Sequence, residues 1–206
     1  MSSSDLERWN AKYAQARSAS LPAADNWLID QVSPLRPGRA LEFACGFGQN
    51  AIWLARQGWQ VDAVDISPVG LSHAGHLARA AEVEVNWIAA DLDEFTGDAE
   101  VYDLVVVFRF LDRARLPAQI ERALKAGGRL VYETFTVRHL ARPESHMKNP
   151  AFALQPGELP TLFPGCDPLS YAECSLPDRD VARLVAERGR KVEGVKESKS
   201  HYERRQ

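Results

Sequence analysis

The middle of the chain alternates short apolar runs with longer segments in which apolar residues recur every three or four positions. Runs of the first kind are typical of strands, and segments of the second kind are typical of amphipathic helices. The alternation predicts βαβ units, and therefore an α/β fold with a parallel sheet. The expected strands cover residues 39–44, 60–64, 84–88, 102–108 and 129–135.

Start and stop signals for the intervening helices agree with this pattern. Gly58 is a natural left-handed stop for the helix after the first strand. Ser67 is a good N-cap for the next helix, and Pro68 stands where a first helical turn tolerates proline. A third helix has Leu116 and Ile120 on one stripe and is expected to end at Gly127–Gly128. The strand at 102–108 is apolar enough to be covered on both faces.

The N-terminal flank is expected to consist of helices within residues 5–33, the first of them at 5–17. The segment 137–168 contains six prolines, which predicts a loop with at most a brief helix near residues 157–163. These flanks belong to a single domain that covers residues 1–190.

The C-terminal part has two interpretations. A strand pair fits residues 169–174 and 181–186, but residues 180–189 alone fit a capped helix equally well. The tail at 191–206 is charged and is expected to fray.

Composition limits the classes of function. A net charge of −3 and a pI near 6.0 give no broad basic field, so nucleic acid is an unlikely partner. Cys45, Cys166 and Cys174 lack CxxC spacing, which suits neither a disulfide framework nor a metal site. The N-terminus lacks the apolar core of a signal peptide, and no segment is long and apolar enough to span a membrane. We therefore expect a cytoplasmic protein, a monomer or a homodimer.

The most informative stretch is a glycine-bearing turn that follows the first strand. Gly46 and Gly48 allow a sharp turn and a close approach to a ligand, and the next helix opens with free N–H groups. Glu42 places a carboxylate beside this turn, where it suits a cationic group. Asp65 ends the second strand, where an acidic side chain can accept both hydroxyls of a ribose.

Over residues 5–190 the sequence resembles the class I methyltransferases that use S-adenosylmethionine (SAM). The run from Glu42 to Gly48 matches their first motif, with Ala44 where the family usually has glycine, and alanine fits there if its φ is negative. The resemblance implies a three-layer αβα Rossmann-like sandwich, whose seven-stranded sheet is mostly parallel with an antiparallel C-terminal strand. It also implies S-adenosylhomocysteine as product and no metal. The implied cofactor-binding residues are Glu42, Ala44, Gly46, Gly48, Asp65, Ile66, Asp91, Leu92 and Phe108.

Within this class, residues 9–13 and 45–55 are similar to the small-molecule enzymes of the tellurite-resistance and thiopurine group. This similarity predicts a small acceptor such as a thiol or an oxyanion. Arg109 and His139 are the candidate catalytic residues, although Arg109 fits a structural ion pair as well, and a solvated position is the stronger interpretation of His139. Trp9 and Tyr13, four residues apart on one helix face, are a possible lid over the cofactor. Residues 149–159 are expected to shape the acceptor side.

Three other functions compete with this one. The turn also satisfies the G-x-G-x-x-[GA] pattern of a nicotinamide-dinucleotide oxidoreductase, but Glu42 would repel a pyrophosphate. An RNA or protein methyltransferase would use a basic strip, for which the candidates are Arg109, Arg113, Arg115 and Arg138. The third competing function is a SAM-binding module without catalysis.

Overall fold

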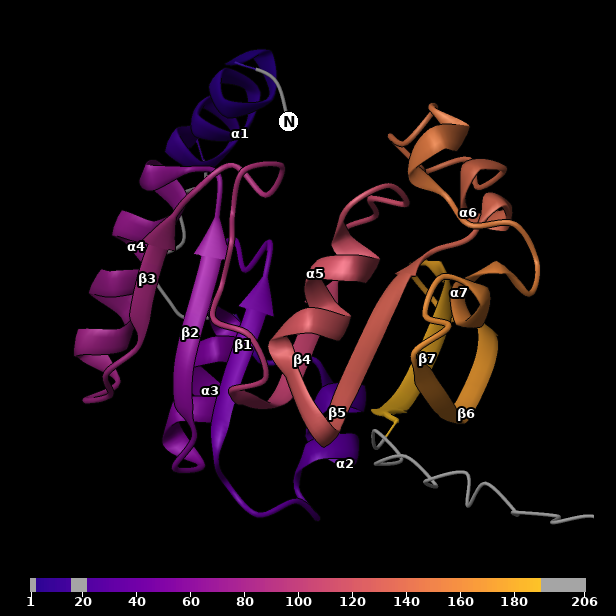
Figure 1. Cartoon of the computed structure of the whole chain (residues 1–206). Coiled ribbons are helices and arrows are strands. Elements are labelled where there is room, and N and C mark those ends of the chain that lie inside the picture. The colour runs from indigo at the N-terminus through magenta and orange to yellow at the C-terminus, as the bar shows by residue number, and fades with distance from the viewer. Residues whose placement is uncertain (1–2, 16–21, 190–206) are drawn as a thin grey trace, which may run out of the picture.

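The computed structural model describes residues 3–15 and 22–189. Seven strands form one sheet in the order β3-β2-β1-β4-β5-β7-β6 (Figure 1). The strands are β1 (Arg39–Phe43), β2 (Gln60–Asp65), β3 (Asn86–Ala89), β4 (Tyr102–Phe108), β5 (Leu124–Phe135), β6 (Cys166–Ser175) and β7 (Asp180–Arg188). β7 runs antiparallel to both of its neighbours, and the other pairings are parallel. The expected sheet, mostly parallel with an antiparallel C-terminal strand, is confirmed.

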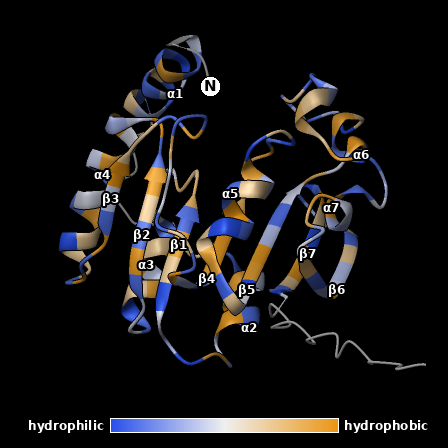
Figure 2. Cartoon of the chain, in the orientation of Figure 1, coloured by the Kyte–Doolittle hydropathy of each residue, from blue (hydrophilic) through white to orange (hydrophobic). Residues whose placement is uncertain are grey.

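Helices cover both faces of this sheet. α2 (Asn26–Val32), α3 (Gln49–Arg56) and α4 (Pro68–Ala80) pack on one face, where Leu28, Leu54 and Val106 share a buried core. α5 (Leu116–Ala123) and α7 (Glu158–Thr161) pack on the other face, around Val105 and Tyr132. In Figure 2 the apolar colour lies on the strands and on parts of the helices beside them, as expected of a sheet buried between two helical layers. The three-layer αβα sandwich is confirmed.

Local signals explain where several elements begin. The hydroxyl of Ser67 accepts a hydrogen bond of 3.1 Å from the N–H of Gly70 and caps α4, and Pro68 is its first residue. Gly58 follows α3 with a φ of +89°, the left-handed stop that was expected. The prediction for α5 was wrong at its end, because Leu124 already has extended backbone (φ −68°, ψ 135°) and pairs with Tyr102.

The C-terminal ambiguity is resolved in favour of strands. Residues 180–189 do not form a helix, because β7 inserts between β5 and β6 and pairs along most of its length with both. Val181, Leu184 and Val185 are buried there. A strand covered on both faces is apolar without strict alternation, which is why its sequence also fitted a helix. The predicted frayed tail lies outside the described residues.

The flanking segments lie at the carboxyl-terminal end of the sheet. α1 (Ser3–Gln15) lies beyond the ends of β1 and β2, and α6 (Val137–Leu140) lies beyond β5 (Figure 1). The proline-rich segment contains α6, a 3-10 turn at Pro150–Phe152 and α7, so the brief helix expected near 157–163 is present and two further short helices were missed. Within the described part of the chain, every helix is too short or too polar to cross a membrane.

Candidate active site

Two cavities open at the carboxyl-terminal end of the sheet. The smaller one, of about 260 Å³, lies over the turn after β1 and the end of β2. The larger one, of about 1050 Å³, lies between α1, the loop after β4 and the proline-rich segment. Four residues line both cavities, so the two spaces share a wall: Trp9, Lys12, Arg109 and Phe110. Open α/β sheets bind ligands at this edge.

The turn after β1 forms the floor of the smaller cavity. Ala44, Cys45 and Gly46 line it, and Gly46 has a φ of +57°. The condition under which alanine fits this position easily, a negative φ, is not met, since the φ of Ala44 is +53°. An alanine in the left-handed region is strained by about 1–2 kcal/mol relative to ordinary backbone, so the surrounding turn must impose this conformation. Cys45 is a packing residue, because its thiol is buried and burial raises its pKa.

Gly48 is required for packing against a side chain. A Cβ on Gly48 would lie 2.3 Å from the ring of Trp87, and its φ is +69°. It does not line either cavity. Gly48 therefore lets the start of α3 pack closely against Trp87 of β3.

Asp65 lies at the end of β2 and lines the smaller cavity. Its two carboxylate oxygens accept hydrogen bonds from the N–H of Gly46 (2.8 Å) and the N–H of Ser67 (2.9 Å). Burial raises the pKa of Asp65, and these N–H donors oppose that rise. Each oxygen keeps a second lone pair for a ligand hydroxyl. The backbone bonds fix the carboxylate at the cavity wall.

Glu42 is buried deeper, behind the turn. Its Oε1 accepts a hydrogen bond of 3.0 Å from the amide of Asn50, whereas Oε2 is buried and has no partner among the described residues. Burial raises the pKa of Glu42 to about 8. A buried carboxylate oxygen without a partner is costly. The arrangement suits a cationic group that reaches Oε2.

Asp91 and Leu92 are not among the residues that line either cavity. Asp91 accepts a hydrogen bond of 2.8 Å from the N–H of Asp93, which caps the turn after β3. Leu92 is buried in the core beside α5. Ile66 and Phe108, in contrast, line the smaller cavity. A contact of Asp91 or Leu92 with a cofactor stays a prediction from the resemblance.

α1 covers the smaller cavity with two stacked rings. The centroids of Trp9 and Tyr13 lie 5.6 Å apart, and Tyr13 meets Phe47 of the turn edge to face at 4.8 Å. The hydroxyl of Ser67 donates to the side-chain oxygen of Asn10 at 2.6 Å, which ties α1 to the start of α4. Both rings line the cavity, as the proposed lid requires.

The candidate catalytic residues lie on the larger cavity. Arg109 follows β4 with a φ of +58°, and its guanidinium makes no hydrogen bond or ion pair with a described residue. His139 is buried rather than solvated, because its ring stacks on Phe135 at 4.5 Å. Its Nδ1 is buried without a partner in the described part of the chain. Burial and the charge of Arg142 lower its pKa, so the imidazole is neutral at pH 7.

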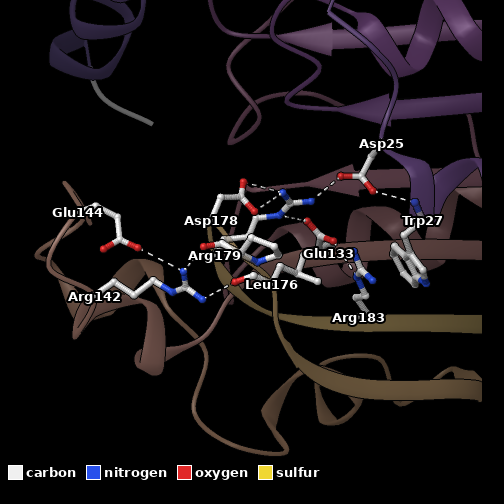
Figure 3. Close-up of polar contacts among 10 residues, drawn as sticks. Asp25, Trp27, Glu133, Arg142, Glu144, Leu176, Asp178, Arg179 and Arg183 are labelled. Carbon is white, nitrogen blue, oxygen red and sulfur yellow. Dashed lines mark hydrogen bonds and ion pairs between the residues drawn. The ribbon is translucent and has the colours of Figure 1, made fainter.

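Sequence reasoning missed a polar network that joins the N-cap of α2 with β5 and with the start of β7 (Figure 3). Arg179 donates to Asp25 at 2.7 Å and to Glu133 at 3.0 Å, and Arg183 donates to the other oxygen of Glu133 at 2.8 Å. Glu133 is fully buried. The Asp25–Arg179 contact joins residues 154 positions apart, so no local pattern announces it.

This network continues to the buried carboxylate behind the turn. The N–H of Asp25 donates to Asn50 at 3.1 Å, and the amide of Asn50 donates to Glu42. Arg179 also lines the larger cavity. A chain of contacts therefore connects the Glu42 carboxylate behind the turn with Arg179 in the wall of the larger cavity.

Two of the four arginines of the proposed basic strip, Arg113 and Arg115, are paired with carboxylates. Arg113 is paired with Glu158 and also donates to the carbonyls of residues 151 and 153, which holds the proline-rich segment in place. Arg115 pairs with Asp93 at 2.7 Å, and Arg138 donates to Ser175 at 3.0 Å. Only Arg109 of the four makes no such contact with a described residue. This arrangement does not favour an RNA-binding surface.

Comparisons with known proteins agree with this geometry. Residues 40–128 match the family model described as a methyltransferase domain. The chain is 26% identical over 185 residues to thiopurine S-methyltransferase of Vibrio cholerae, which covers 79% of this chain and 83% of that enzyme. It is also 26% identical over 110 residues to ubiquinone biosynthesis O-methyltransferase of Coxiella burnetii, covering 52% of this chain and 47% of that one.

Solved structures share the fold. Geranyl diphosphate C-methyltransferase of Streptomyces coelicolor, in complex with Mg²⁺, geranyl diphosphate and S-adenosylhomocysteine, superposes with a TM-score of 0.63 and 17% identity. The superposition covers 79% of this chain and 76% of that one. The chain spans only 35% and 47% of the length of the first two curated relatives that it matches.

Proposed function

We propose that this chain, which carries a class I methyltransferase domain, transfers a methyl group from SAM to a small-molecule acceptor. The observation that carries the proposal is the unpartnered Oε2 of Glu42, buried behind a left-handed turn. Asp65 lies beside the same turn and lines the smaller cavity, and the larger cavity shares a wall with that smaller one. The SAM amine and ribose would meet complementary groups at these carboxylates.

The residues in and behind the smaller cavity divide the task of holding SAM. Glu42, which is buried behind the turn, would bind the amine. The turn at Ala44 and Gly46 lines the cavity and would border the methionyl part. Asp65 would accept the ribose hydroxyls, and Ile66 would pack on the adenine. Trp9 and Tyr13 of α1 would exclude water from above.

When bound, SAM supplies a methyl group on a sulfonium, which is activated toward in-line displacement. The chain's own contribution is mainly orientation, which can account for about 7–11 kcal/mol of such a barrier. Phe108, Arg109 and Phe110 leave β4 between the two cavities and are placed to align the acceptor. His139 is neutral at pH 7 and lines the larger cavity, so it can accept a proton from an acceptor that arrives protonated.

We also propose that the protein works in the cytoplasm as a monomer or homodimer. The free thiols of Cys45, Cys166 and Cys174 support a reducing compartment. No nucleic-acid or membrane partner is part of the proposal.

Incubation with methyl-labelled SAM and a panel of thiols, phenols, carboxylic acids and RNA tests this function. We expect label on at least one small molecule, and a loss of rate of about a hundredfold or more in His139→Asn for an acceptor that must lose a proton. Label on RNA alone would contradict the proposed acceptor class. SAM binding without transfer to any acceptor would indicate a binding module instead.

A further inference from the structure

The charged residues of the larger cavity fall into two groups, those with an opposite charge nearby and those without. All of the carboxylates that line the cavity belong to the first group or cap a turn. Four of them form ion pairs: Asp5 with Arg8 at 2.8 Å, Asp93 with Arg115 at 2.7 Å, Glu144 with Arg142 at 3.3 Å and Asp178 with Arg179 at 2.9 Å. The fifth, Asp112, accepts a hydrogen bond of 2.7 Å from the N–H of Ala114.

The cations are not balanced in the same way. Arg8, Arg113 and Arg179 are taken up by ion pairs. Lys12, Arg109 and Lys148 make no ion pair with any residue that the structure describes, and all three line the larger cavity. The cavity therefore carries an excess of positive charge although the whole chain has a net charge of −3.

Two of these cations lie where the cavities meet. Lys12 and Arg109 line both spaces, and the Nζ of Lys12 lies 4.4 Å from the centroid of the Trp9 ring. Partial burial lowers the pKa of Lys12, and the charges of Arg8 and Arg109 lower it further. Positive charges that repel one another are stabilised by an anion between them.

Large apolar side chains form another part of the wall. Phe110, Leu111, Phe135, Met147 and Phe152 line the cavity, and Phe152 is exposed for such a large apolar side chain, at 44%. The volume of about 1050 Å³ is at the upper end of what binds drug-sized ligands and far exceeds that of a bare oxyanion. This volume and these apolar side chains suit a ligand whose body has substantial apolar surface.

We infer that the methyl acceptor is an amphipathic anion, an aromatic or aliphatic body with a carboxylate-type or phosphate-type group held by Lys12 and Arg109. This inference rests on the proposed function and adds the charge and the size of its acceptor. Lys12 lies on α1, so the helix that covers the cofactor site would also recognise the acceptor.

Calorimetry on the full chain saturated with S-adenosylhomocysteine tests the inference with two matched probes, 2-naphthoate and the uncharged 2-naphthamide. We expect 2-naphthoate to bind at least tenfold more tightly than 2-naphthamide. Lys12→Gln and Arg109→Gln should each remove most of this preference, and Arg109→Lys should keep it. Arg36→Gln removes an exposed arginine between α2 and β1, remote from both cavities, and should bind both probes like the wild type.

The outcomes separate the two claims. Absence of heat with S-adenosylhomocysteine itself would contradict the proposed function. If that ligand binds but the two naphthalene probes bind equally, or neither binds, the inference on the acceptor is overturned and the proposed function stands. The melting temperature and the S-adenosylhomocysteine affinity of each variant show whether a lost preference is specific, and retention of the preference in both Arg109→Gln and Lys12→Gln would overturn the assignment of these two residues.

Discussion

The buried amide of Asn50 donates a hydrogen bond of 3.0 Å to Oε1 of Glu42, whereas Oε2 has no partner among the described residues. Asn50 is 1% exposed and Glu42 is 2% exposed, so bulk solvent hardly reaches the other oxygen. Asn50 is held in turn by the N–H of Asp25. The carboxylate of Glu42, which is proposed to bind the cofactor amine, is therefore fixed in position before any ligand arrives. One of its oxygens is left without a partner among the described residues.

The stability of the cofactor-free protein should depend on pH through Glu42. Burial raises its pKa from 4.5 to about 8, so the folded state holds a proton that the unfolded state releases. The resulting stabilisation is present in full below about pH 4.5 and is lost as the pH rises through about 8. We expect the free energy of unfolding, measured in urea, to fall over this range. Glu42→Gln should flatten the slope, and an unchanged slope would contradict the assignment.

The same titration predicts how the cofactor binds. An ammonium group needs the ionised carboxylate, so S-adenosylhomocysteine affinity of the wild type should rise as the pH approaches about 8. Glu42→Gln should bind more weakly and without this rise. Calorimetry across the pH range checks both statements, and an equal pH dependence in the two proteins would show that another group titrates.

Asp65→Ala should weaken S-adenosylhomocysteine binding at least tenfold, because it removes the proposed ribose acceptor and frees the N–H groups of Gly46 and Ser67. Asp30→Ala, an exposed carboxylate on α2, is the matched control and should bind normally. Unchanged affinity in Asp65→Ala would refute the ribose contact.

Ala44→Gly should stabilise the fold by about 1 kcal/mol, because glycine adopts the left-handed conformation without strain. Ala40→Gly, at a buried position of β1 without such a φ, should destabilise it. Chemical denaturation of both variants gives the comparison. A loss of stability in Ala44→Gly would mean that the Cβ contributes packing that outweighs the strain.

Glu133→Ala should destabilise the protein by about 3–5 kcal/mol, because it leaves Arg179 and Arg183 without their shared carboxylate. Glu187→Ala removes a partly exposed partner of Arg129 at 3.5 Å and serves as the control, with an expected change below about 1 kcal/mol. Similar losses in the two variants would contradict a special role for the network.

Much of the fold was predictable because local signals and burial coincide. The limits of β4 follow from a continuous apolar run, and the start of α4 follows from Ser67 and Pro68. β7 was ambiguous because a strand between two others is buried on both faces and loses its alternation. The sheet that surrounds β7, rather than its own sequence, decides its structure.

The candidate site was predictable only where a residue's role depends on its strand position. Asp65 and Glu42 lie at strand ends, and they are found beside the turn as expected. Gly48 has its role through Trp87, which is distant in sequence, and Arg179 meets Asp25 only in the folded chain. Such contacts arise from tertiary packing and leave no trace in periodicity or spacing.

The central claim is that the turn around Cys45 binds the nucleoside of SAM through carboxylates on adjacent strands. Titration of the folded wild-type chain with S-adenosylhomocysteine, and separately with NADH, measures this most directly. The account predicts saturable heat with S-adenosylhomocysteine at one site per chain and none with NADH. Saturation by NADH together with no response to S-adenosylhomocysteine would contradict it.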